Sequence, residues 1–158
     1  MQRQNGTLIL LPVQQKALEM LLEATQTDTI ALLRGRPRSG KTTILKRLQT
    51  ESGGVLLGLR DSANVVDSDA PSFIEEGFLR MMQDALSSYD LVIIDDLQVI
   101  TTVTHNSDPE RAYLLDAALT AMIGEAVFLK KTMVFATEGD APWPILRRAF
   151  TCEIGDSG

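Results

Sequence analysis

Hydrophobic residues are arranged along this chain in two alternating patterns. Short runs of aliphatic residues that end in polar residues predict buried β-strands. Longer stretches with apolar residues every three or four positions predict helices with one buried face. The expected strands are residues 29–33, 55–59, 91–94, 132–137 and 150–154, and the expected helices are residues 13–24, 42–49, 72–87, 108–131 and 143–148.

The order of these elements predicts the fold class. Strands alternate with helices along the chain, which is typical of a parallel sheet covered by helices on both faces. We therefore expect an α/β fold with three layers. The 158 residues fit a single domain, residues 1–158. Residues 61–71 are expected to form a polar loop, and so is the region around the single histidine, His105.

The segment between the first expected strand and its helix carries the clearest motif. Residues 35–42 read GRPRSGKT and match the GxxxxGK(S/T) pattern of a phosphate-binding loop. In such a loop the backbone N–H groups and the helix N-terminus bind phosphate, Lys41 reaches the β- and γ-phosphate oxygens, and Thr42 supports Mg²⁺. An ordinary glycine turn is the alternative. The expected nucleotide-binding residues of this segment are Gly35, Arg36, Pro37, Arg38, Ser39, Gly40, Lys41, Thr42 and Thr43.

A second acidic motif follows the third expected strand. Four consecutive aliphatic residues, 91–94, are followed by Asp95 and Asp96. Carboxylates at the end of a buried strand can support a magnesium ion beside the loop hydroxyl. We expect Asp95 to hold Mg²⁺ together with Thr42, and Asp96 to orient the attacking water. The alternative is that both aspartates only open a polar turn.

The overall charge restricts the possible partners. The formal net charge of −6 argues against broad, sequence-independent binding of nucleic acid. Nucleic acid is therefore expected only through a partner or through one local basic patch. That patch consists of Arg34, Arg36, Arg38, Lys41, Lys46 and Arg47, and bound polyphosphate explains it as well.

The remaining composition favours a cytoplasmic protein without membrane contact. No apolar run reaches the length that spans a membrane, and residues 1–5 lack the apolar core of a signal peptide. The single cysteine, Cys152, cannot form an internal disulfide and is expected to be a small core residue. A zinc site at His105 is not expected, because no second metal-type ligand lies near it in sequence.

With these elements placed, the chain resembles the additional-strand class of P-loop ATPases, and within it the AAA+ core subdomain. The resemblance covers about residues 11–154, and residues 94–98 (IDDLQ) are similar to the Walker B segment of the replication-initiator and helicase-loader clade. It implies a five-stranded parallel sheet in the order 5-1-4-3-2, and ATP and Mg²⁺ as cofactors. It also implies assembly into a homo-oligomer or with a protein partner.

The resemblance also implies roles for four further positions. Thr137 matches the polar sensor position beside the γ-phosphate. Arg147 and Arg148 match the segment that sends an arginine into a neighbouring subunit. Gln15, or its neighbour Gln14, lies where relatives contact adenine. Each position also has a simpler interpretation: Thr137 as the end of a strand, the arginines as a solvated helix end, and the glutamines as exposed helix surface.

The sequence departs from the family pattern in several places. Asp96 stands at the position of the catalytic glutamate, Thr137 at a position that is commonly asparagine, and Arg38 at a loop position that is often glycine. The helical lid that follows this core in the family has no counterpart in residues 1–158.

These observations favour a magnesium-dependent ATPase module that acts through self-assembly or a partner. Three alternatives remain open: a signalling switch that binds nucleotide but turns it over slowly, a small-molecule or nucleoside kinase, and a fragment of a helicase motor. The helicase alternative rests on residues 11–48, which also resemble a helicase first lobe.

Overall fold

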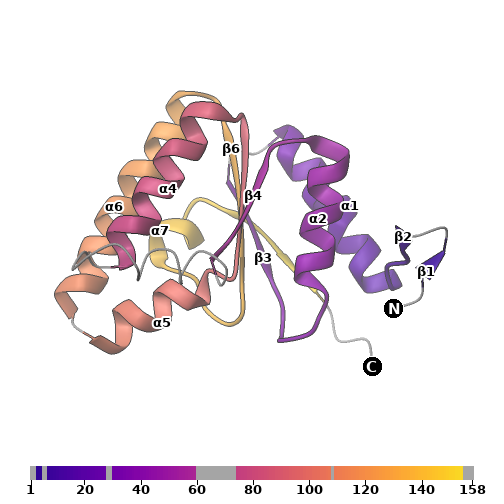
Figure 1. Ribbon diagram of the computed structural model, residues 1–158, viewed down its shortest axis with the longest axis horizontal. Coiled ribbons are helices and arrows are strands. Elements are labelled where there is room, and N and C mark those ends of the chain that lie inside the picture. Colours follow the sequence, from indigo (N-terminus) through magenta and orange to yellow (C-terminus); the bar gives the residue numbers. More distant parts are fainter. Residues whose placement is uncertain (1–2, 5–6, 28–29, 60–73, 108, 155–158) are drawn as a thin grey trace.

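The sheet at the centre of the molecule confirms the expected fold class. The computed structural model describes residues 3–4, 7–27, 30–59, 74–107 and 109–154 (Figure 1). Its main sheet has five parallel strands in the order β4-β5-β6-β3-β7. Counted from the loop-bearing strand β3, this is the expected order 5-1-4-3-2. The strands are β3 (Ile30–Arg34), β4 (Val55–Gly58), β5 (Leu91–Asp95), β6 (Thr132–Thr137) and β7 (Phe150–Glu153).

Helices cover both faces of this sheet and complete the three layers. Figure 1 shows α1 and α2 on one side, and α4, α5, α6 and α7 on the other. The helices are α1 (Pro12–Thr27), α2 (Lys41–Ser52), α4 (Ile74–Ser88), α5 (Gln98–Ser107), α6 (Pro109–Phe128) and α7 (Trp143–Leu146).

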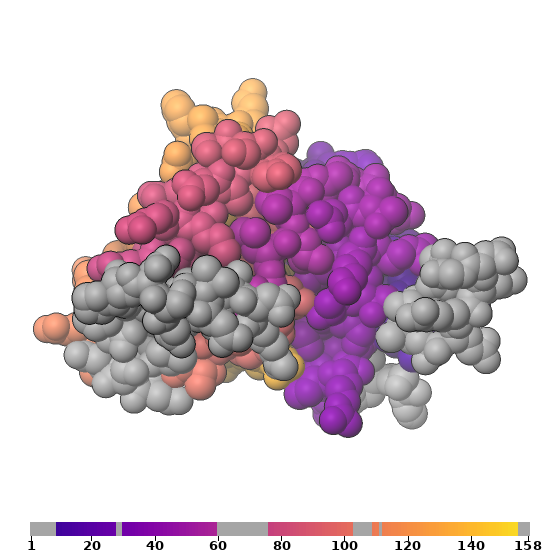
Figure 2. Space-filling model, in the orientation of Figure 1, coloured from indigo at the N-terminus to yellow at the C-terminus, as the bar shows by residue number. Residues whose placement is uncertain are grey.

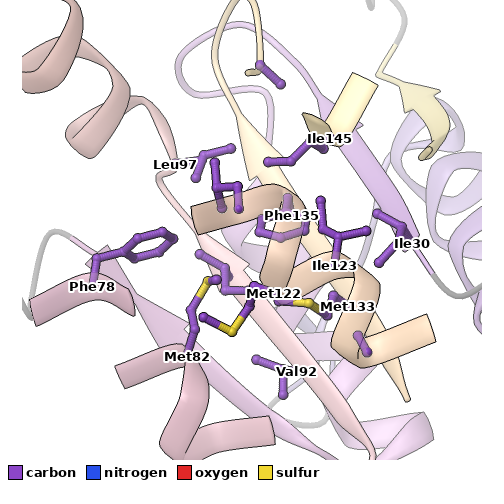
Figure 3. Packing of buried hydrophobic residues seen from close by; sticks show 14 of the residues in the cluster. Ile30, Phe78, Met82, Val92, Leu97, Met122, Ile123, Met133, Phe135 and Ile145 are labelled. Carbon is purple, nitrogen blue, oxygen red and sulfur yellow. The ribbon is translucent and has the colours of Figure 1, made fainter. Parts of the chain in front are cut away.

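The strands divide their side chains between two hydrophobic cores. Successive strand residues point to opposite faces, so each aliphatic run supplies both cores. On β6, Met133 and Phe135 join the larger core below α4, α5 and α6 (Figure 3), and Val134 joins the smaller one below α1 and α2. Cys152 is fully buried in the smaller core, as expected, and burial raises the pKa of its thiol to about 11. Burial on both faces is the reason why the three central strands, β3, β5 and β6, are continuous hydrophobic runs, whereas the edge strand β7 is mostly exposed.

The expectation of a polar loop around His105 was wrong. Residues 98–107 form α5, although their sequence, QVITTVTHNS, is rich in β-branched residues of low helix propensity. Ile100 is buried in the larger core with Leu97, which precedes the helix. Tertiary packing of this segment therefore outweighs its intrinsic preference.

Other boundaries differ from the expectations by a few residues. The helix expected at 108–131 begins at Pro109 and ends at Phe128, after which Lys130 adopts a positive φ of 59°. A short antiparallel pair, β1 (Arg3–Gln4) with β2 (Thr7–Leu8), was not expected. The polar loop at 61–71 and the helix start at Ser72 lie outside the described residues. Within the described part of the chain, no helix is both long and apolar enough to cross a bilayer.

Candidate nucleotide-binding site

The GRPRSGKT loop connects β3 to α2 at the carboxyl edge of the sheet. In Figure 2 this part of the chain, in purple, projects at the lower edge of the molecule. Both of its glycines lie in close contact with neighbouring side chains. A Cβ on Gly35 would lie 2.5 Å from Ser39 Oγ, and one on Gly40, where φ is +94°, would lie 2.3 Å from Gln14 Nε2. Arg38 also has a positive φ, 63°, a backbone conformation that glycine adopts more easily than other residues do.

Lys41, the first residue of α2, folds back over the loop. Its Nζ donates hydrogen bonds of 2.8 Å to the carbonyl oxygens of Gly35 and Arg36, and its side chain contacts Ser39 Oγ at 3.5 Å. The residue is only 6% exposed. A buried lysine is costly unless its charge is satisfied. The loop therefore holds the ammonium group of Lys41 against two of its own carbonyl oxygens.

Thr42, in the first turn of α2, and Asp95, the last residue of β5, meet at the site. Thr42 Oγ1 donates a hydrogen bond of 2.6 Å to Asp95 Oδ2, across 53 positions of sequence. The other oxygen, Asp95 Oδ1, accepts the backbone N–H of Asp96 at 2.8 Å. Burial raises the pKa of Asp95, and the bond from Thr42 opposes that shift only in part. A hydroxyl and a carboxylate held together are oxygen donors of the kind that Mg²⁺ prefers.

The raised pKa of Asp95 predicts a pH-dependent cost in stability. An aspartate ordinarily titrates at 3.8, and the folded-state pKa lies above this value. Well below pH 3.8 the carboxyl is protonated in both the folded and the unfolded state, so its burial then costs no stability. As the pH rises through the folded-state pKa, the buried group must become charged and the fold loses stability. Asp95→Asn avoids this penalty, because its amide can donate to Thr42 Oγ1 while its oxygen accepts from Asp96.

We therefore expect ligand-free Asp95→Asn to melt at a higher temperature than the wild type at pH 7.5. The difference should shrink as the pH falls towards 4, which calorimetry at a series of pH values measures. The control is Asp84→Asn, the same change at an exposed position on α4. A variant that melts at or below the wild-type temperature at pH 7.5 would show that burial of this carboxylate carries no net cost.

Gln98 connects the two strand ends that flank the site. Its Nε2 donates to Asp96 Oδ1 at 3.1 Å, and its Oε1 accepts the backbone N–H of Glu138 at 3.2 Å. Asp96 has a positive φ of 61° and is half-buried. Gln98, the first residue of α5, thus orients the carboxylate of Asp96, which we expect from the sequence to orient the attacking water. Sequence reasoning did not give Gln98 or Glu138 a role, although polar residues directly after a buried strand were the available signal.

Two cavities open beside these residues. The first has a volume of about 430 Å³, within the range of small-molecule sites, and the second, about 360 Å³, shares Glu138 with it. The first is lined by Arg38, Gly40, Lys41, Thr42, Thr43, Asp96 and Glu138. The second is lined by Gln98, Thr101, Thr102, Glu138, Asp140, Ala141 and Pro142. The structure thus brings the GRPRSGKT loop, Asp96 and the end of β6 around one space.

Thr137, Arg147 and Arg148 are among the expected residues that do not line the first cavity. Thr137 is fully buried, and its Oγ1 donates to the backbone oxygen of Glu138 at 3.3 Å. Arg147 and Arg148 are exposed at the end of α7. Their role towards a neighbouring subunit stays a prediction.

The two candidate glutamines of α1 differ in position. Gln15 is exposed, and its Nε2 donates to Glu19 Oε1 on its own helix at 3.4 Å. Gln14 is buried, donates to Ser39 O at 2.9 Å and accepts the backbone N–H of Leu11 at 2.9 Å. Gln14 therefore contacts the loop, and the structure does not bring Gln15 to it.

Comparison with known proteins supports the fold. No protein-family model matches this sequence, and no curated protein sequence matches it either. The fold is similar to the crystal structure of domain III from the Thermotoga maritima replication initiation protein DnaA, with a TM-score of 0.58 and 15% sequence identity. The similarity covers 94% of this chain and 65% of that chain. At this level of identity the similarity concerns the fold alone, and that fold is P-loop NTPase-like.

Proposed function

We propose that this chain is a magnesium-dependent ATPase module of the AAA+ type that acts through self-assembly or with a protein partner. The observation that carries the proposal is the 2.6 Å contact between Thr42 Oγ1 and Asp95 Oδ2. A threonine that opens a helix and an aspartate that ends a buried strand have no need to meet in an ordinary glycine turn. Their contact supports a shared role in holding a cation.

The oxygen and nitrogen groups of this site fit a nucleotide with its magnesium ion. Thr42 and Asp95 would hold Mg²⁺, and the loop N–H groups with Lys41 would hold the phosphates. When bound, Mg²⁺ neutralises charge on the phosphate oxygens. Lys41 Nζ would exchange its two carbonyl acceptors for phosphate oxygens. The ammonium group of Lys41 thus already lies in the loop before the ligand arrives.

Asp96 would orient the attacking water. This assignment is supported by its place in the lining of the first cavity with Lys41 and Thr42, and by the hydrogen bond that Gln98 donates to one of its carboxylate oxygens. An aspartate reaches one methylene less far than the glutamate of related ATPases. The bond to Gln98 compensates in part, because it restricts the shorter side chain.

Calorimetry with ATP, in the presence and absence of Mg²⁺, tests the proposal together with an assay of phosphate release. We expect tighter binding with Mg²⁺ and measurable turnover. If the protein binds no nucleotide under either condition, the proposal is wrong.

Asp96→Asn is expected to retain ATP binding and to lose turnover. Asparagine tolerates the positive φ at this position and can still accept the bond from Gln98, so the fold is preserved. Loss of the carboxylate should lower the rate by roughly 10²–10⁴-fold, while affinity stays nearly constant. Phosphate release and calorimetry measure the two quantities. Asp84→Asn serves again as the exposed control, and unchanged turnover in Asp96→Asn would remove Asp96 from the mechanism.

A small-molecule kinase is the second candidate, and the second cavity is the observation that favours it. Its lining combines the amide of Gln98, two threonine hydroxyls and two carboxylates, and it adjoins the first cavity at Glu138. A screen with nucleosides, alcohols and amines as phosphoryl acceptors separates the two candidates. Transfer to one acceptor faster than to water would favour the kinase.

A further inference from the structure

The outer side of α6 carries large hydrophobic residues that the fold does not use. The inner side of the helix is buried in the larger core through Leu115, Leu119, Met122, Ile123 and Ala126. On the outer side Tyr113 is 73% exposed, its neighbour Leu114 is 60% exposed, and Phe128 at the end of the helix is 85% exposed. Contiguous exposed apolar surface of this kind marks interaction sites.

The exposed residues form one stripe along the helix. Tyr113, Ala117, Ala121, Gly124 and Phe128 follow each other at intervals of three or four residues, so they lie on one face. We call this set the outer stripe. It has an aromatic residue at each end and three small residues between them. The order is therefore nearly the same when it is read from either end, with its centre between residues 120 and 121.

Gly124 indicates that something packs against the stripe. A glycine in the middle of a helix costs about 0.5–1 kcal/mol relative to alanine. The fold of the chain itself does not require this glycine, because an added Cβ would have no neighbour within 4 Å. A small residue at this position does permit the close approach of a second helix.

We propose that the outer stripe docks on the outer stripe of a second copy of this chain, with the two α6 helices antiparallel. An isologous contact requires a surface that complements itself. In this arrangement the aromatic ends of each stripe flank the small centre. The charges are complementary in this arrangement: Glu110 lies in the first turn of α6 on the same face, and Lys130 is exposed just beyond the end of the helix. Antiparallel helices bring each Glu110 near the Lys130 of the other copy, whereas parallel helices would bring like charges together.

The contact should be weak, because one helix face buries less than the roughly 1,200–2,000 Å² of a standard stable interface. We expect a monomer–dimer equilibrium that sedimentation detects between about 5 and 500 µM protein, the range that such small interfaces occupy. Wild-type protein that stays monomeric across this range would overturn the proposal.

Ala121→Glu tests the surface. Both copies would place a carboxylate near the two-fold axis, so the dimer fraction should fall at least tenfold. Ala121 is exposed, so the monomer should fold as the wild type does, which circular dichroism checks. The control is Gln83→Glu, which adds the same side chain at an exposed position on α4. A dimer that persists in Ala121→Glu lies on another surface and overturns the proposal.

Single cysteine substitutions test the orientation. The native Cys152 is fully buried, so an introduced cysteine is the reactive one. In the antiparallel pair two copies of Ala121→Cys adjoin the axis and should form a disulfide under mild oxidation. Two copies of Tyr113→Cys lie ~22 Å apart along the helix and should not. Cross-linking of Tyr113→Cys would show a parallel pair and contradict the proposal.

These outcomes are independent of the proposed ATPase function. The stripe lies on α6, and none of its residues lines the first cavity. Ala121→Glu should therefore bind ATP like the wild type. Loss of dimerisation with intact nucleotide binding would separate the two roles, and loss of both would show that the substitution had disturbed the fold.

Discussion

Lys41→Ala is expected to remove most of the affinity for ATP. The ammonium group is buried in the GRPRSGKT loop, where its Nζ is 2.8 Å from two carbonyl oxygens and contributes to the lining of the first cavity. Each charge-assisted hydrogen bond that phosphate loses is worth about 1.5–3 kcal/mol, or roughly 10–150-fold in affinity. Calorimetry with ATP and Mg²⁺ measures the loss directly.

The matched control for this variant is Lys46→Ala. Lys46 lies on the same helix, is exposed, and carries the same charge, so long-range electrostatic effects are similar in both variants. Only Lys41→Ala should weaken binding strongly. Equal losses in the two variants would indicate a general effect of charge, and equal affinity in Lys41→Ala and the wild type would refute the nucleotide site.

Arg147→Ala or Arg148→Ala is expected to lower ATP turnover without lowering ATP affinity. Both arginines are exposed after α7 and line neither cavity of their own chain. An arginine supplied by another subunit stabilises the charge on the transferred phosphoryl group, and such residues contribute about 10³–10⁵ in rate. The specific activity of the wild type should also rise with protein concentration.

The control is Arg80→Ala, at an exposed arginine of α4. It should leave both turnover and its concentration dependence unchanged. Constant specific activity across a hundredfold dilution, with normal turnover in both arginine variants, would show that these residues only end a helix. Ala121→Glu separates the role of the proposed α6 contact from that of the two arginines, because it would remove the contact and leave both arginines in place.

The central strands were well predicted because burial on both faces requires continuous hydrophobic runs. Each of the five expected strands is present, and no boundary differs by more than one residue. The order of the strands in the sheet was not predicted from the hydrophobic pattern. It followed from the resemblance to a known family, since a hydrophobic pattern does not indicate which strand lies beside which.

The local hydrophobic pattern did not predict the helix that is rich in polar and β-branched residues. Residues 98–107 contain the features of a loop or strand, yet they form α5 because Ile100 is buried in the larger core. That packing depends on residues contributed by α4 and α6. A single window of sequence does not contain the information that decides it.

What the sequence alone determined is the local chemistry of this protein: the GRPRSGKT loop, the aspartates after a buried strand, and the α/β alternation. Each of these features depends on consecutive residues or on a short repeat of apolar positions, so a short stretch of sequence is enough to predict it. What only the tertiary structure decided is which distant groups meet. The bond from Thr42 to Asp95, the contact of Gln14 with Ser39, and the bridge of Gln98 to Glu138 join elements 25 to 53 positions apart. Such contacts follow from the parallel order of the strands, which places the ends of β3, β5 and β6 at one edge of the sheet.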